Sequence, residues 1–437
     1  MSHADTSSNA LDVALNEYLG WTGDPVATLK AAVAADPGFI LGHTTLAALH
    51  SLGGIPGSAK PIARALTTAN ALAGTASAQQ RLHLAAANSW AEGDIEGAAA
   101  FWETALEADP ADLLALRLAH DTHFYLGAGE KLRDVPLAVL PAYRKDPVRR
   151  GFVLGMAAFG LEETGAYAEA ERAGREAVDV NPADSWAVHA VTHVLEMQDR
   201  ADEGISWLRG LEPHWAPAAG LAVHQWWHAG LYLIELGRLD EVLTIYDAHI
   251  RPGADAQVLD LVDAAALLWR LQLLGLNVDD RWQDLVPLWR RHAEDHVLAF
   301  NDVHIALTLA GAGEDEAIGQ LEESLARYAN GAKGTNARVS TELGLPLTRA
   351  LRAFQNGDYQ QTVAIMTPLF KHLAPVGGSN AQRDLFIQTL GIAAFKTGAD
   401  EIAVSVLAER RRLKAGMPRA WAGLASAGRD VSNAFPI

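Results

Sequence analysis

The feature that most constrains the fold of this chain is an internal repeat. Four related tripeptides end at Pro37, Pro110, Pro182 and Pro252, and these prolines are 73, 72 and 70 residues apart. A spacing of about twice 36 residues is typical of arrays of helical hairpins, in which each hairpin packs only against its neighbours. The repeat therefore predicts a helical array.

Two of the repeated segments align without a gap. In each, a glycine is placed to close the turn of a hairpin, small residues let two helices approach closely, and a proline stops the second helix. This pattern is the tetratricopeptide signature. The aligned positions are Gly93, Ile95, Ala98, Trp102, Ala105, Leu106 and Pro110 in one segment and Gly165, Tyr167, Ala170, Gly174, Ala177, Val178 and Pro182 in the other.

For the whole chain we predict an all-α fold without an internal domain boundary. Tetratricopeptide-like hairpins over residues 11–416 are expected to form one right-handed superhelix. Residues 1–10 are expected to be a flexible N-terminal tail, because they are polar and lack the apolar stretch of a signal peptide. Residues 417–437 are expected to be a C-terminal tail that packs on the last repeat or frays from it.

Charge and cysteine content exclude several classes of function. The 437 residues carry 53 acidic and 35 basic side chains, for a formal net charge of −18. Such a chain lacks the electropositive surface that nucleic acids and anionic membranes require. The absence of cysteine excludes disulfides, thiolate nucleophiles and cysteine-bearing metal sites, and is typical of a reducing cytosol. We therefore expect a cytoplasmic protein with no nucleic acid or membrane partner, and the sequence leaves open whether it is a homodimer.

Two segments carry histidine pairs at helical spacing. Each pair is followed by a carboxylate on the same helix face, because residues three and four apart are neighbours on a helix. A His-x-x-x-His pair can hold a metal ion from one helix, as in zinc metalloproteases. However, Ala190 and Gln225 stand where those enzymes have glutamate, which argues against metalloprotease chemistry. We assign no residue as a metal ligand. The two stripes are Trp186, His189, His193 and Glu196, and His224, His228, Leu231 and Glu235.

A third pair, His120 and His123, follows Pro110 at the place of the first helix of a repeat, which lines the concave face of such arrays. We predict that His193 and His228 are close neighbours and share a cavity with His120 or His123. Three interpretations stay open: hydrogen-bonded core histidines, acid/base or polar-ligand groups, and a metal site. The candidate catalytic residues are His120, His123, His189, His193, Glu196 and His228.

These blocks resemble the tetratricopeptide repeat protein 38 family. The similar stretches are residues 120–127, 153–178, 184–208, 224–247 and 377–386, and Asn380 stands where the family pattern usually has histidine. The resemblance implies an all-helical, soluble intracellular protein and little about its activity. It also places Asp247, Arg383 and Asp384 in the family's blocks. The candidate ligand-binding residues are then Trp186, His224, Trp226, Trp227, Asp247, Arg383 and Asp384.

Two functions from different classes remain. The first is a protein with a pocket lined by histidines and carboxylates that binds a small polar molecule and could turn it over by acid/base chemistry. The second is a scaffold that binds a peptide or protein partner in its concave groove, the usual role of such arrays. The histidines and tryptophans of the inner helices favour the first. The sequence names no cofactor and does not decide whether the protein is an enzyme.

Overall fold

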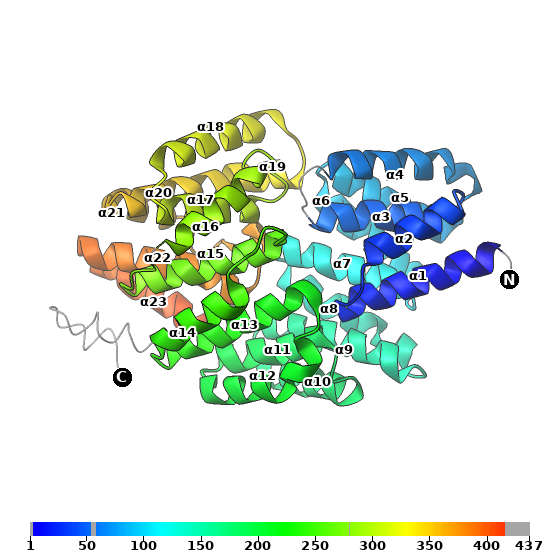
Figure 1. Cartoon of the computed structure of the whole chain (residues 1–437), viewed down its shortest axis with the longest axis horizontal. Helices are drawn as coiled ribbons and strands as arrows, with labels where there is room; N and C mark the ends of the chain where they lie inside the picture. Colours follow the sequence, from blue (N-terminus) through cyan, green and yellow to red (C-terminus); the bar gives the residue numbers. More distant parts are fainter. Residues whose placement is uncertain (1–2, 54–57, 279, 416–437) are drawn as a thin grey trace. The chain divides into compact units, whose positions relative to one another are not determined.

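The computed structural model describes residues 3–53, 58–278 and 280–415 (Figure 1). Within these ranges the chain consists of helices and their connections, and no described residue lies in a β-strand. The predicted all-α fold is thus confirmed. In the same part of the chain, no helix is both long and apolar enough to cross a membrane.

The described helices group into two compact units. The first unit is the described part of Met1–Val191 with Pro213–Ala222 and Ala332–Arg338, and the second is that of Thr192–Glu212, Val223–Gly331 and Val339–Ile437. Four helices contribute residues to both units. They are α11 (Ser185–Met197), α12 (Ala201–Trp215), α13 (Ala219–Glu235) and α19 (Thr335–Val339).

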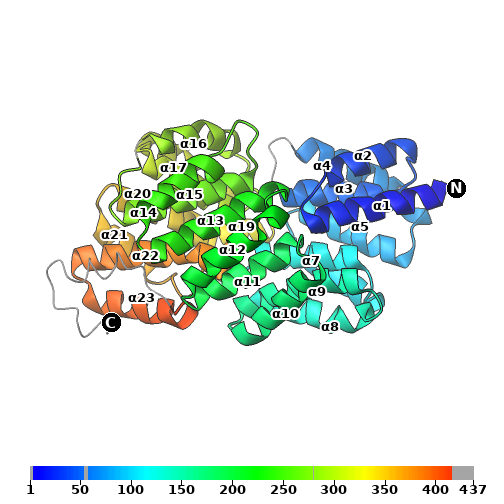
Figure 2. The ribbon, with the colours of Figure 1, turned by 60° about the horizontal axis from the view of Figure 1, so that its bottom comes forward.

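The first unit is a series of hairpins. Consecutive helices pack against each other, and α8, α9 and α10 lie side by side in both views (Figures 1 and 2). Its helices are α1 (His3–Gly20), α2 (Pro25–Ala35), α3 (Ile40–Gly53), α4 (Ala59–Ala71), α5 (Ala78–Ala91), α6 (Ile95–Ala108), α7 (Leu113–Tyr125), α8 (Gly129–Val139), α9 (Pro147–Glu163) and α10 (Tyr167–Val180).

In the second unit, α15 packs against α17 and α22, and α22 lies beside α23 (Figures 1 and 2). Its remaining helices are α14 (Leu239–Ile245), α15 (Val258–Leu273), α16 (Arg281–Trp289), α17 (Ala299–Gly311), α18 (Asp315–Gly331), α20 (Leu345–Gln355), α21 (Tyr359–Met366), α22 (Asn380–Thr397) and α23 (Asp400–Leu413).

The turns of the hairpins follow the sequence signals. Gly93 lies between α5 and α6 with φ 84°, and Gly165 lies between α9 and α10 with φ 81°, a backbone conformation that favours glycine. α6 ends two residues before Pro110, and α10 ends two residues before Pro182. The predicted hairpins and their ends are therefore confirmed. The superhelix and its hand remain predictions.

The small residues of the repeat lie where helices touch. Ala170 is fully buried on α10, which packs against α9. A leucine at this position must force the helices apart, so Ala170→Leu is expected to lower the free energy of unfolding by about 1–3 kcal/mol. Urea unfolding followed by circular dichroism measures the change. Ala168→Leu, at an exposed position of the same helix, is the control and should have little effect. Equal unfolding curves for both variants would show that Ala170 is not a tight contact.

The structure differs from the expected tail at the N-terminus. α1 begins at His3, within the expected tail, and Ser7 Oγ donates a hydrogen bond to Asp36 Oδ2 at 2.8 Å. Further along the same helix, Ala14 and Leu19 are buried. The C-terminal tail expected over residues 417–437 lies outside the described residues.

Candidate functional site

Helices α11 and α13 hold the two histidine pairs. The carboxylate of Asp184 starts α11 by accepting a hydrogen bond from the N–H of Ala187 at 3.0 Å, as an N-cap residue does. Because the spacing within each pair is four residues, both rings of a pair lie on one helix face. All four histidines are buried: His189 and His193 on α11, and His224 and His228 on α13.

Three of these histidines gather in the second unit. The ring centroids of His193 and His228 lie 4.5 Å apart, and those of His224 and His228 lie 4.8 Å apart. Each ring offers one nitrogen within 4.8 Å of a nitrogen of the other two. The prediction that His193 and His228 are close neighbours is confirmed. We call His193, His224 and His228 the histidine cluster.

Carboxylates orient two rings of the cluster. Nδ1 of His228 lies 2.7 Å from Oε2 of Glu196, and Nδ1 of His224 lies 2.9 Å from both carboxylate oxygens of Asp263. An ionised carboxylate only accepts hydrogen bonds, so Nδ1 is the donor in each ring. The other nitrogen, Nε2, is then the one with a lone pair. This is how histidine ligands are oriented in many metal sites and how histidine bases are oriented in enzymes.

A buried lysine stands behind Glu196. Lys414 Nζ donates to Oε1 of Glu196 and to Oε1 of Glu235, each at 2.9 Å. Burial by itself would lower the pKa of Lys414, but the two carboxylates outweigh it and hold the pKa above its usual value. Lys414 therefore stays charged and forms an ion pair with the buried Glu196.

His228 of the cluster is uncharged near neutral pH. Burial, and then the neighbouring His193 and His224, lower the pKa of His228 well below its usual value. The neutral imidazole is the form that binds a metal ion or accepts a proton.

The other predicted residues of the second unit have separate roles. Trp227 is fully buried and stacks on His224 with ring centroids 5.0 Å apart, while Trp226 stacks on His249 at 3.9 Å. Asp247 forms an ion pair with Arg281.

Arg383 and Asp384 lie near the start of α22. Arg383 donates to Oδ1 of Asn380 at 2.8 Å and to the carbonyl of Gly378, so it orders the turn before the helix. Asp384 pairs with the buried Arg410 at 2.9 Å. Asn380 is thus a hydrogen-bond partner of Arg383.

The predicted residues of the first unit form a group of their own. The ring of His120 lies 6.0 Å from that of Phe159 and 5.6 Å from that of Trp186, and His189 lies 5.6 Å from Phe159 and 5.0 Å from Trp186. These contacts give the two histidines a role in aromatic packing.

His123 has a carboxylate partner in the first unit. Its Nε2 lies 3.1 Å from Oε1 of Glu103, and Lys131 binds the other oxygen of that carboxylate. The hydrogen bond with His123 is the main cause that lowers the pKa of Glu103 to about 2. A cavity shared by His120 or His123 with the cluster remains a prediction.

No family model matches the chain. The resemblance to the tetratricopeptide repeat protein 38 family therefore remains a prediction, and the case for a function depends on the geometry described above.

Sequence reasoning missed Asp263 and Lys414. Asp263 is a fully buried carboxylate inside the apolar helix α15, and such a residue is a signal that could have been read, since a buried charge needs a partner. Lys414 carried no signal, because it lies 218 residues from Glu196 in the sequence.

Proposed function

We propose that the protein binds a divalent transition-metal ion at His193, His224 and His228 and that the ion offers an open coordination position to a small polar molecule. The observation that carries this proposal is the approach of three buried ring nitrogens to within 4.8 Å of one another. Three protein ligands and one open position are typical of catalytic zinc sites.

The distances support an ion of this size. Tetrahedral coordination at 2.0–2.1 Å sets ligand nitrogens about 3.4 Å apart. Nitrogens within 4.8 Å of one another need side-chain movements of about 1 Å to reach that geometry. Imidazole ligands suit zinc, copper, iron and nickel.

The surroundings support the same proposal. Glu196 and Asp263 bind Nδ1 of two rings and so aim Nε2, which is the role of outer partners in metal sites. The ring of His228 is already in the neutral form that binds a metal ion, because burial lowers its pKa. On this proposal the histidines are metal ligands, which is one of the three interpretations that the sequence left open.

A cobalt titration tests the proposal. Full-length protein is treated with EDTA and titrated with Co²⁺, whose visible absorption reports its coordination, and Zn²⁺ is then added as a competitor. We expect one ion per chain, absorption bands of low-coordinate Co²⁺ and displacement by Zn²⁺. Zinc at about 100 times its Kd should also stabilise the fold by about 2.7 kcal/mol. An unchanged spectrum of hydrated Co²⁺, with no thermal stabilisation, would refute the metal site.

The second candidate is direct binding of a small polar molecule by the imidazoles, with acid/base chemistry. The observation that favours it is the Nδ1 contact of His224 and His228 with carboxylates, which leaves Nε2 as an acceptor. It predicts that small polar molecules raise the melting temperature of EDTA-treated protein. The scaffold for a peptide or protein partner remains an alternative based on the repeat pattern alone.

A further inference from the structure

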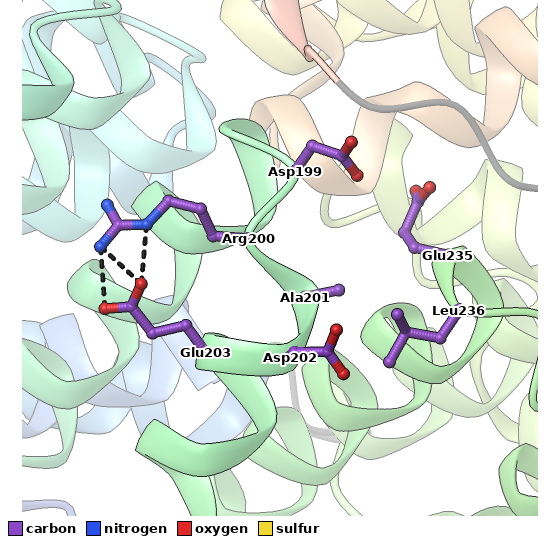
Figure 3. A pocket seen from close by; sticks show the side chains of 7 residues that line it. All are labelled: Asp199, Arg200, Ala201, Asp202, Glu203, Glu235 and Leu236. Atoms are coloured by element: carbon purple, nitrogen blue, oxygen red, sulfur yellow. Dashed lines mark hydrogen bonds and ion pairs between the residues drawn. The ribbon is translucent and has the colours of Figure 1, made fainter. Parts of the chain in front are cut away.

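A cavity of about 320 Å³ lies in the second unit, between the start of α12 and the end of α13 (Figure 3). Asp199, Ala201, Asp202, Glu235 and Leu236 line it together with the pair Arg200 and Glu203. This volume is within the range of sites for small molecules. We propose that the cavity binds a small aliphatic cation with two or more ammonium groups, of the polyamine class.

The charge of the cavity favours a cation. Arg200 is the one basic residue among those that line the cavity, and it forms an ion pair with Glu203. Its Nε and Nη2 donate to the carboxylate oxygens of Glu203 at 2.9 and 2.8 Å. Figure 3 shows this pair to one side, with Asp199, Asp202 and Glu235 around the remaining space. The lining holds four acidic residues and one basic residue, so it is net negative even with Lys414 paired to Glu235.

Glu235 gives an independent indication of a ligand. It is only 7% exposed, and its Oε1 accepts a hydrogen bond from Lys414. Its Oε2 is buried and has no hydrogen-bond partner among the described residues. A buried carboxylate oxygen without a donor is costly, so a donor that enters the cavity would bind strongly. An ammonium group supplies charge and N–H donors together.

The arrangement suits an organic cation better than a metal ion. Metal sites need several ligand atoms close together, and the groups of described residues that meet this condition do not include these carboxylates. The carboxylates lie around the cavity wall instead of at one point. This arrangement matches a polyamine, whose ammonium groups are separated by methylene groups. Ala201 and Leu236 supply apolar contacts for such a chain.

This inference goes beyond the proposed metal site and does not depend on it. Lys414 stands between the two sites, 2.9 Å from Glu235 in the cavity wall and 2.9 Å from Glu196 beside the histidine cluster. No histidine of the cluster is among the residues that line the cavity.

Calorimetric titration with spermidine tests the inference. Full-length protein in EDTA is titrated at low and at high salt, beside the variants Asp202→Asn and Asp240→Asn. Both aspartates are exposed second residues of a helix, α12 or α14, so each variant loses one negative charge at an equivalent place. Asp240 is not among the residues that line the cavity, which makes it the matched control.

We expect one spermidine per chain, binding that Asp202→Asn weakens about 10- to 100-fold, and an unchanged affinity in Asp240→Asn. Equal weakening in both variants would mean non-specific attraction to a chain of net charge −18 and would overturn the inference. Absence of binding, or binding only after a metal ion is added, would also overturn it. The last result would leave the metal proposal intact, so the two can fail separately.

Discussion

His228→Ala is expected to abolish tight metal binding. His228 is the ring that both other members of the cluster approach, at 4.5 Å from His193 and 4.8 Å from His224. Loss of an outer partner of a metal site costs about 10–100-fold in affinity, and loss of a ligand itself should cost more than the upper end of that range. Competition of Zn²⁺ with a chromogenic chelator measures the affinity.

His304→Ala is the matched control for this variant. His304 is also a fully buried histidine of the second unit, and its Nδ1 lies 2.7 Å from the carbonyl oxygen of Phe300, outside the cluster. Its replacement should destabilise the fold and leave the zinc affinity of the folded protein unchanged. If both variants lose zinc equally, the loss reflects damage to the fold, and the cluster is not the site.

Asp384→Asn is expected to lower the free energy of unfolding by about 3–5 kcal/mol, because it leaves a buried arginine without its main counterion. The Asp384 carboxylate accepts from Arg410 Nε and Nη2 at 2.9 and 3.1 Å, and Arg410 is 1% exposed. Burial by itself would raise the pKa of Asp384, but Arg410, Lys414 and Arg270 outweigh it and lower that pKa. The Asp384 carboxylate is therefore charged at neutral pH. Replacing it with an amide leaves the buried guanidinium of Arg410 without a negative partner at this position. Urea unfolding gives the free energy.

The control for this variant is a pair of the same geometry at the surface. Asp315 accepts from Arg352 Nε and Nη2, both at 2.7 Å, but the two side chains are 52% and 33% exposed. Because water and salt screen an exposed pair, Asp315→Asn should cost at most about 1 kcal/mol. Similar losses in the two variants would mean that burial does not decide the strength of the Asp384 pair.

Much of the local structure could be predicted from the sequence. Gly93 and Gly165 close turns, and α6 and α10 end just before Pro110 and Pro182, as their positions in the repeat indicated. These signals act within a few residues, through the backbone preferences of glycine and proline. The exception is the first part of α1, residues 3–10, for which a polar composition suggested a tail. Ser7 in this part is buried and bonded to Asp36, a contact across 29 positions that a local signal does not show.

Part of the histidine cluster could also be predicted from local signals in the sequence. Spacing alone put His224 and His228 on one face of a helix, since helical periodicity is a local property. That this face is buried and lies against His193 was inferred from the repeat, and the structure shows both.

The sequence by itself determined the helical class, the hairpin turns and the histidine pairs, because each depends on residues at most a few turns apart. Only the tertiary structure decided which charges meet. Lys414 reaches Glu196 across 218 positions of the chain, and Asp263 reaches His224 across 39. The tertiary structure also decided the division into two units. Contacts of this kind depend on how whole helices pack, and a buried charge shows that it needs a partner without showing which residue will provide it.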